Sequence, residues 1–294
     1  MHTDRKEIQS VYLSVFIGAL SVASILFAQS TKPSSRPGGE IVPPPRRDVP
    51  GKRVTLTSGE LFVPEFFHAD DRADVVVWFL GAPWCVEQVF YDAHKNAAVL
   101  VVNSKTLAHG FPRSQDFSDL LHDVAGALKT DGITNKGVGH VALVSFSGGW
   151  TGTYSVLQHA DLAKQIDNVV LLDSLYAWNK KEGAIDAPTI TPFLDFARRA
   201  VDQNATFVFT QLYPPQAKYR SNTTTICASY LIDRLGLDRK DAAGANAAGA
   251  QLLYRAEKGN AHILGYAGMT NQDHFNHLYG AATALKLMSL PDAK

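Results

Sequence analysis

Short runs of apolar residues recur along the chain between residues 75 and 210. They are rich in Val, Leu and Phe and do not alternate with polar residues, which is typical of β-strands covered on both faces. The runs are Val75–Leu80, Ala97–Val102, Val141–Phe146, Val169–Leu172 and Ala205–Thr210. A last short strand is expected at residues 261–268. We therefore predict a sheet whose central strands are buried.

Segments with helical spacing lie between and after these runs. In the first of them, Leu120, Val124 and Leu128 fall on one apolar stripe. The predicted helices are Phe117–Leu128, Trp150–Ile166, Phe193–Val201 and His274–Met288. Strands that alternate with helices indicate an α/β domain, with a mostly parallel central sheet flanked by helices on both faces. We expect this domain to span residues 53–294 and to begin with an N-terminal strand hairpin around Ser58-Gly59-Glu60.

The first thirty residues have a composition of their own. A polar start with Arg5 and Lys6 precedes the uncharged run Val11–Ala28, and the segment ends in Ala28-Gln29-Ser30. This pattern predicts a secretory signal, although the length of the run also suits an N-terminal membrane anchor. In either case we expect the body of the protein to be secreted or periplasmic, touching a membrane only through residues 11–28. Residues 31–52 are rich in Pro, Ser and Gly, which predicts a linker.

Composition and charge narrow the classes of protein. The chain is 46% hydrophobic and 19% charged, which predicts a packed core and excludes wholesale disorder. The 28 basic residues balance the 28 acidic ones, so no overall field recruits nucleic acid, and we expect none as a partner. Cys85 and Cys227 are too few for a disulfide framework or a Cys-based zinc site, although a single bridge between them stays open.

The sharpest motif is the strand Val141–Phe146 followed by Ser147-Gly148-Gly149 and a helix that starts near Trp150. It resembles the nucleophile elbow of the α/β-hydrolase superfamily, in which a strained strand-to-helix turn lifts a serine clear of the sheet. Small residues two before and two after the serine allow the close backbone approach. Gly149 fits the second position, and Ser145 stands where the first glycine is usual. The alternative is that Ser147 merely caps the helix.

The same resemblance implies an acid and a histidine on loops after later strands, in that order along the chain. Asp173 directly follows the strand Val169–Leu172, and no acidic residue follows the next strand until Asp233. Asp173 is therefore the expected acid. His274, at the start of the last predicted helix, is the expected base, and His277 lies one turn further on. The rival interpretation takes Asp273, His274 and His277 as metal ligands, but histidines at this spacing are common by chance.

The resemblance also implies two backbone donors for an oxyanion. Gly148 would supply one, and the loop after the strand Val75–Leu80 would supply the other. Pro83 has no N–H, so Ala82 is the expected second donor. Leu80 stands where the family often has a histidine. Glu87 and Gln88 follow this loop and could line a pocket, but we expect them on a solvated helix face.

These residues together predict an exported serine hydrolase that needs no metal and no organic cofactor. Its expected partner is a small-molecule ester or related acyl substrate, with amide or peptide cleavage as an alternative. Another alternative is a non-catalytic exported binding protein on the same scaffold. A dinucleotide-binding oxidoreductase is disfavoured, because the glycines near residue 148 have neither the position nor the spacing of that fingerprint. The segment Pro214–Ala250 is expected to be an insert, whose end is either a mobile flap or a helix surface of small residues.

Overall fold

The architecture rests on a computed structural model, which describes residues 39–294 except 70, 104–113, 135, 180–183 and 215–222. Residues 11–28, the predicted signal or anchor, lie outside the described residues. Within the described part, no helix is both long enough and apolar enough to cross a bilayer. The described residues belong to a single compact unit.

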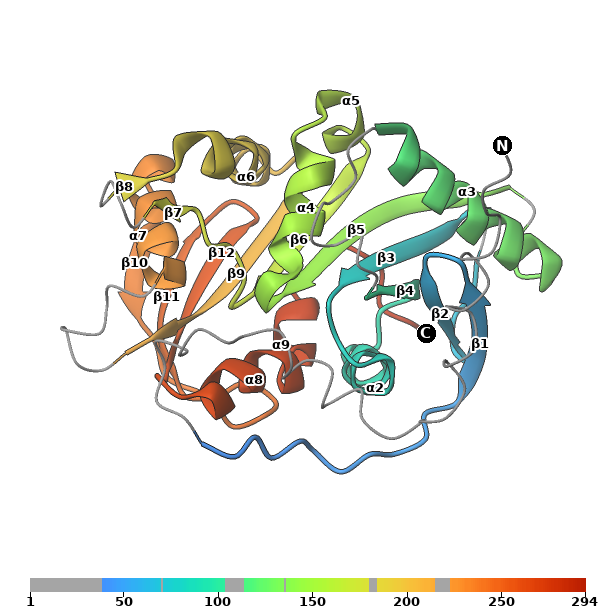
Figure 1. Cartoon of the computed structure of the whole chain (residues 1–294), viewed down its shortest axis with the longest axis horizontal. Helices are drawn as coiled ribbons and strands as arrows, with labels where there is room; N and C mark the ends of the chain where they lie inside the picture. The colour runs from blue at the N-terminus through green and yellow to red at the C-terminus, as the bar shows by residue number, and fades with distance from the viewer. Residues whose placement is uncertain (1–38, 70, 104–113, 135, 180–183, 215–222) are drawn as a thin grey trace, which may run out of the picture. The chain divides into compact units, whose positions relative to one another are not determined.

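One large sheet runs through the described part of the chain (Figure 1). Its ten strands have the order β1-β2-β4-β3-β5-β6-β9-β12-β11-β10. Their bounds are β1 Gly51–Leu56, β2 Gly59–Pro64, β3 Ala73–Phe79, β4 Ala98–Val102, β5 Val138–Phe146, β6 Ile166–Leu172, β9 Thr206–Tyr213, β10 Asp238–Asp241, β11 Leu252–Lys258 and β12 Ala261–Ala267. The six strands from β4 to β12 in this order are mutually parallel, and antiparallel strands extend both edges. A separate two-stranded ribbon joins β7 Trp178–Asn179 to β8 Ala184–Ile185.

Helices cover both faces of the sheet. One face packs against α3 Ser114–Thr130, α4 Trp150–Leu157, α5 Ala160–Ala163, α6 Ala187–Val201 and α7 Thr223–Leu235. The other face packs against α2 Pro83–Ala93, α8 Asn271–Tyr279 and α9 Ala282–Leu285. Strand β3 sends Val75, Val77 and Phe79 to the first core and Val76 and Trp78 to the second. This explains its unbroken apolar run and confirms the predicted fold class, together with the hairpin β1-β2.

Two of the predicted helices extended too far. The helix from Trp150 stops at Leu157, because His159 is extended, and Ile166 is the first residue of β6 rather than part of a helical stripe. The predicted helix His274–Met288 is split into α8 and α9 by Gly280. A Cβ at Gly280 would collide with the side chain of Asn246, so a small residue is needed at this break.

The cysteine bridge that the sequence left open does not exist. Cys85 lies on α2 and Cys227 on α7, which cover opposite faces of the sheet. Both thiols are free and buried, and burial raises the pKa of each to about 12. The two residues therefore act as small apolar side chains of two separate cores.

The described parts of the expected insert and linker include regular structure and contacts with the domain. The described part of Pro214–Ala250 contains α7 and β10, and residues 242–250 form neither a helix nor a strand. Asn246 holds that stretch by accepting the N–H groups of Ala248 and Ala250. Residues 42–50 of the predicted linker, here named the N-terminal strap, lie against the domain, with Val49 only 3% exposed.

Candidate active site

The turn after β5 has the geometry of a nucleophile elbow. Ser147 has a φ of +53°, which is uncommon for a residue with a Cβ, and a single turn of 3-10 helix, Ser147–Gly149, leads into α4. Gly149 is packed so closely on the Phe79 carbonyl that a Cβ would collide with it. A Cβ at Gly152 would collide with the Phe79 ring. These glycines let α4 approach β3, as the sequence motif predicted for Gly149.

Ser145 is fully buried where the resembling family usually has glycine. Its hydroxyl lies 3.1 Å from that of Ser174, and the Ser174 hydroxyl donates to the Ser147 carbonyl over 2.7 Å. Since the Ser174 proton is used there, Ser145 is the donor in the first bond. The extra hydroxyl is therefore satisfied and ties the elbow to the residue after Asp173.

Asp173 lies at the carboxyl end of β6 with a φ of +40° and is fully buried. One carboxylate oxygen accepts the Leu212 N–H over 3.2 Å and the Thr224 hydroxyl over 2.7 Å. The other lies 2.6 Å from Nδ1 of His274. Strand β9 and helix α7 thus supply donors to an acid that comes from β6, which explains why no acid is needed after β9.

His274 lies in the first turns of α8 and is 7% exposed. Its ring stacks on Phe146, with centroids 4.6 Å apart and planes 26° apart. Because Phe146 directly precedes Ser147, the imidazole lies beside the elbow. The structure thus brings together the predicted acid and histidine, next to the segment that carries the predicted serine.

The other members of the alternative metal set have separate partners. Asp273 forms a capping box with Thr270 at the start of α8, and it also accepts the Met269 N–H. Burial alone would raise the pKa of Asp273, but these hydrogen bonds lower it overall. His277 is buried, with Nδ1 2.8 Å from the Thr210 hydroxyl. The described residues contain no group of three His, Cys, Asp or Glu placed to hold a metal ion.

The expected oxyanion loop follows β3. Leu80 has a φ of +69°, and its N–H donates to the Val102 carbonyl over 3.2 Å. Ala82 precedes α2 in extended conformation, and its carbonyl accepts the Cys85 N–H at the helix start. The Ala82 N–H donates to no group in the part of the chain that the structure describes. Gly148 is the second residue of the helical turn, a position whose N–H has no intrahelical acceptor.

Asn103 is a site residue that the sequence analysis missed. Its side-chain carbonyl accepts the Gly81 N–H over 2.9 Å, and its side-chain NH₂ donates to the Gly81 carbonyl over 2.5 Å. The Gly81 N–H is therefore occupied, which leaves Ala82 as the candidate donor in this loop. The available signal was an Asn immediately after a buried strand, at the edge where strands of a parallel sheet present ligands.

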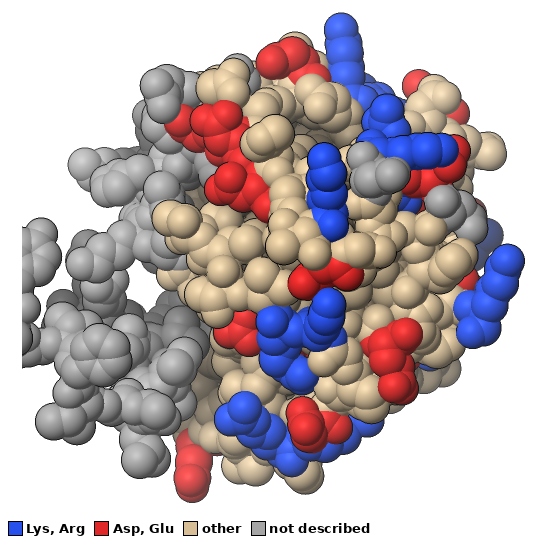
Figure 2. Space-filling view, turned by 90° about the vertical axis from the view of Figure 1, so that its right-hand side faces the viewer, with Lys and Arg blue, Asp and Glu red and all other residues tan. Residues whose placement is uncertain are grey.

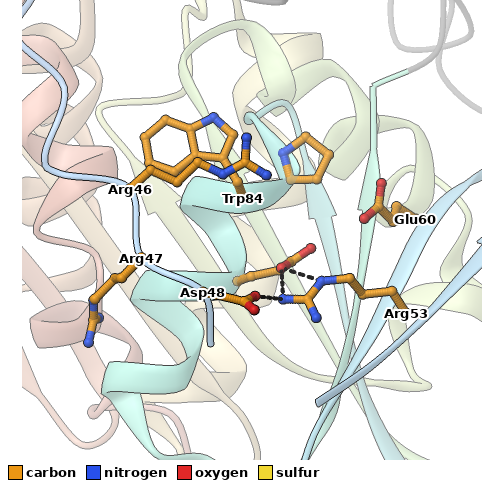
Figure 3. Close-up of a pocket in the computed structure, with 8 residues that line it drawn as sticks. Arg46, Arg47, Asp48, Arg53, Glu60 and Trp84 are labelled. Carbon is orange, nitrogen blue, oxygen red and sulfur yellow. Dashed lines mark hydrogen bonds and ion pairs between the residues drawn. The ribbon is translucent and has the colours of Figure 1, made fainter. Parts of the chain in front are cut away.

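A pocket of about 370 Å³ lies beside the start of α2 (Figure 3). Pro83 and Trp84, the residues after Ala82, form part of its lining, and the Arg46 guanidinium lies 6.0 Å from the Trp84 ring. Glu87 also lines it and is only 4% exposed, so the expectation of a solvated helix face was wrong for this residue. The carboxylate is buried because Arg53 donates to it over 2.7 and 2.9 Å.

Gln88 is also buried rather than solvated. Its amide binds the N-terminal strap, donating to the Pro45 carbonyl and accepting the Arg47 N–H. On the face of the molecule seen in Figure 2, basic and acidic side chains are interspersed.

The strand order, the parallel strands and the turn after β5 are of the α/β-hydrolase type. No family model matches the sequence, and no curated protein does. Among solved structures, siderophore hydrolase EstB from Aspergillus nidulans aligns with 86% of this chain and 99% of its own, at 10% identity and a TM-score of 0.42. Poly(aspartic acid) hydrolase-1 from Sphingomonas sp. KT-1 covers 82% of this chain and 99% of its own, at 11% identity and a TM-score of 0.41.

Carboxylesterase CesB from Bacillus subtilis aligns with 82% of this chain and 90% of its own, at 8% identity and a TM-score of 0.40. Likeness at these values concerns the arrangement of the chain only. The assignment of chemistry to this protein therefore depends on its own residues.

The contact between α4 and β3 predicts that substitution by alanine lowers stability at Gly149 and leaves it unchanged at Gly148. Gly149→Ala should lower the free energy of unfolding by about 2 kcal/mol or more, because the added methyl group collides with the rigid Phe79 backbone. Gly148→Ala is the matched control, since its Cβ would lie 3.8 Å from Leu80, an ordinary contact. Chemical denaturation of both variants measures the difference, and equal stabilities would contradict this packing.

Proposed function

We propose that this protein is a serine hydrolase in which Ser147 is the nucleophile, His274 the general base and Asp173 the acid that orients it. The observation that carries the proposal is the buried 2.6 Å pair of Asp173 and His274, whose imidazole stacks on the residue before Ser147. A buried carboxylate that holds Nδ1 of a histidine next to a strained serine is the arrangement that activates a hydroxyl for acyl transfer.

The proposed reaction starts when Oγ of Ser147 attacks the substrate's carbonyl carbon. Since Nδ1 of His274 is held by Asp173, Nε2 is the nitrogen that takes the serine proton. The N–H groups of Gly148 and Ala82 bind the oxyanion of the tetrahedral intermediate. His274 then gives the proton to the leaving group, which departs and leaves an acyl-enzyme on Ser147. Water attacks the acyl carbon with His274 again as base, and His274 returns that proton to Oγ of Ser147 as the carboxylic acid is released. These steps use no metal and no cofactor.

A carboxylic ester is the proposed substrate class. An alkoxide needs less help to leave than an amine, so a triad with ordinary geometry cleaves esters most readily, and ester cleavage is the commonest activity on this scaffold. Amide or peptide cleavage would use the same residues. If Ser147 does not react, the alternative is a binding protein that uses the same scaffold without catalysis.

Labelling of Ser147 tests the enzyme itself. A fluorophosphonate probe should modify the purified protein at this one serine, because the proposed base makes its hydroxyl far more nucleophilic than surface serines. Mass spectrometry of the labelled peptide identifies the site, and heat-denatured protein and folded Ser147→Ala should both stay unlabelled. If the folded protein is not labelled and does not hydrolyse short aryl esters, the proposed serine hydrolase function is excluded.

Substitution of the proposed triad separates the two histidines of α8. His274→Ala should reduce kcat at least about a thousandfold, and Asp173→Asn should approach a similar loss because it no longer holds the correct tautomer. His277→Ala should affect stability more than turnover, since its Nδ1 contacts Thr210.

His262→Ala is a matched control for these variants. His262 lies on β12, and its Nδ1 is 3.0 Å from the carboxylate of Glu257, so it also pairs with an acid. Steady-state ester hydrolysis by variants with native melting temperatures gives the comparison. If His277→Ala loses activity while His274→Ala keeps it, the base is His277 and the proposal is wrong on this point. If Asp173→Asn keeps nearly full activity, another residue must be the acid.

Export is a separate part of the proposal and depends on residues 1–30. We expect the protein outside the cytoplasm, with a mature chain that begins near Thr31 or with an uncleaved anchor at residues 11–28. Cell fractionation followed by N-terminal sequencing decides between these forms. A full-length protein in the soluble cytoplasmic fraction would refute export without affecting the chemistry of Ser147.

A further inference from the structure

The carboxamide of Asn103 forms two hydrogen bonds with a single residue of the loop after β3. It accepts the Gly81 N–H over 2.9 Å and donates to the Gly81 carbonyl over 2.5 Å. Asn103 directly follows β4, the strand paired with β3 on the side away from β5. The amide group thus continues the pairing of β3 and β4 by one more residue, with a side chain in place of a backbone.

The second of these bonds fixes a peptide group that matters for the proposed reaction. The Gly81 carbonyl and the Ala82 N–H belong to the same peptide unit, which is trans and planar. In such a unit the C=O and N–H bonds point in opposite directions. Holding the Gly81 oxygen toward Asn103 therefore directs the Ala82 N–H away from Asn103.

The order of the strands tells where that N–H points. Strand β3 lies between β4 and β5, with Phe79 opposite Val102 on one side and opposite Ser145 on the other. A carbonyl directed toward the end of β4 places the opposed N–H on the side of β5, where Ser147 follows. The elbow is close on this side, because a Cβ at Gly149 would lie 3.2 Å from Cβ of Leu80.

We propose that Asn103 is a positioning residue that orients the Gly81–Ala82 peptide group so that its N–H faces the oxyanion formed at Ser147. The inference depends on the proposed serine hydrolase function. Asn103 itself touches no reacting atom, and it acts through the direction of a backbone donor.

The loop needs such a constraint because its conformation is not one that the backbone adopts unaided. Leu80 has a φ of +69°, in a region that L residues with a branched side chain rarely occupy. Gly81 is confined by Val86, which a Cβ would approach to 2.7 Å. The Trp78 indole N–H donates to the Leu80 carbonyl over 3.3 Å, but this bond does not restrain the next peptide group. Asn103 contributes the bond that does.

An amide is the functional group that this role requires. Gly81 presents one donor and one acceptor, and the carboxamide of Asn or Gln offers an acceptor and a donor on one planar group without a change of protonation state. In Asn103→Asp the carboxylate keeps the bond from the Gly81 N–H but turns a negative oxygen toward the Gly81 carbonyl. That repulsion favours rotation of the peptide group away from the position argued above.

The same chain offers a closely matched control at the other end of the same strand. Asn96, two residues before β4, accepts the His68 N–H over 2.9 Å and donates to the His68 carbonyl over 2.8 Å. Asn96→Ala removes the same pair of hydrogen bonds at the amino end of β4, whereas Asn103 and the elbow lie at the carboxyl ends of the strands. The two variants separate an effect on the oxyanion from a general loss of stability.

The experiment compares ester hydrolysis and inhibitor binding by the full chain and its Asn103→Ala, Asn103→Asp and Asn96→Ala variants. Asn103→Ala should lower kcat about 10–100-fold with KM changed less than about threefold, since loss of a complete oxyanion donor costs about 100–1000-fold. Asn103→Asp should lose at least as much, and Asn96→Ala should keep kcat. Affinity for a trifluoromethyl ketone, whose adduct carries the oxyanion, should fall in parallel with kcat/KM.

Each other result contradicts the inference in a recognisable way. A folded Asn103→Ala variant with native kcat and native inhibitor affinity would overturn the role of Asn103 while the hydrolase remains. An equal loss in Asn96→Ala would show that only stability has changed. A wild-type protein that neither hydrolyses aryl esters nor reacts with a fluorophosphonate would remove the proposed function together with this role.

Discussion

The buried pair of Asp173 and His274 is the interaction on which the arrangement of this edge of the sheet depends. A carboxylate without solvent costs several kcal/mol unless charged or polar donors surround it. Here the donors come from three separate elements, namely Leu212 on β9, Thr224 on α7 and His274 on α8. These elements are brought together over Asp173, so the fold around the candidate site and the placement of the histidine have one physical cause.

Backbone strain is concentrated at the same edge. Among the described residues, six other than glycine have a positive φ, and four of them, Leu80, Ser147, Asp173 and Leu175, follow the carboxyl ends of β3, β5 and β6. The other two, His94 and Gln203, lie just after helices, where a left-handed residue is ordinary. Each strained residue at the strand ends costs about 1–3 kcal/mol and persists because the packed sheet and the hydrogen bonds around it leave no alternative.

The sequence was sufficient for the fold class, and its local signals selected an acid and a histidine that lie 2.6 Å apart in the structure. Unbroken apolar runs marked the buried strands, and Ser147, Asp173 and His274 each stood at the end of a strand or the start of a helix. Long-range partners left no such signal. Glu87 is buried because Arg53, from β1, pairs with it, and Asn103 has a role because of its contact with Gly81 across 22 residues. The prediction of helix ends was wrong where tertiary contacts determine them, as at Gly280, which packs against the Asn246 side chain.

The N-terminal strap contacts the domain although its composition is rich in proline. Its prolines reduce the entropy lost on ordering, so a few contacts are enough to hold it against the domain. Val42 exchanges hydrogen bonds with Gln272 on α8, and the next residues bind Gln88 on α2. Gln272 lies two residues before His274, and α2 begins directly after Ala82. The strap therefore connects the helix that carries the candidate base to the helix that follows the candidate oxyanion donor, and it braces both from outside the sheet.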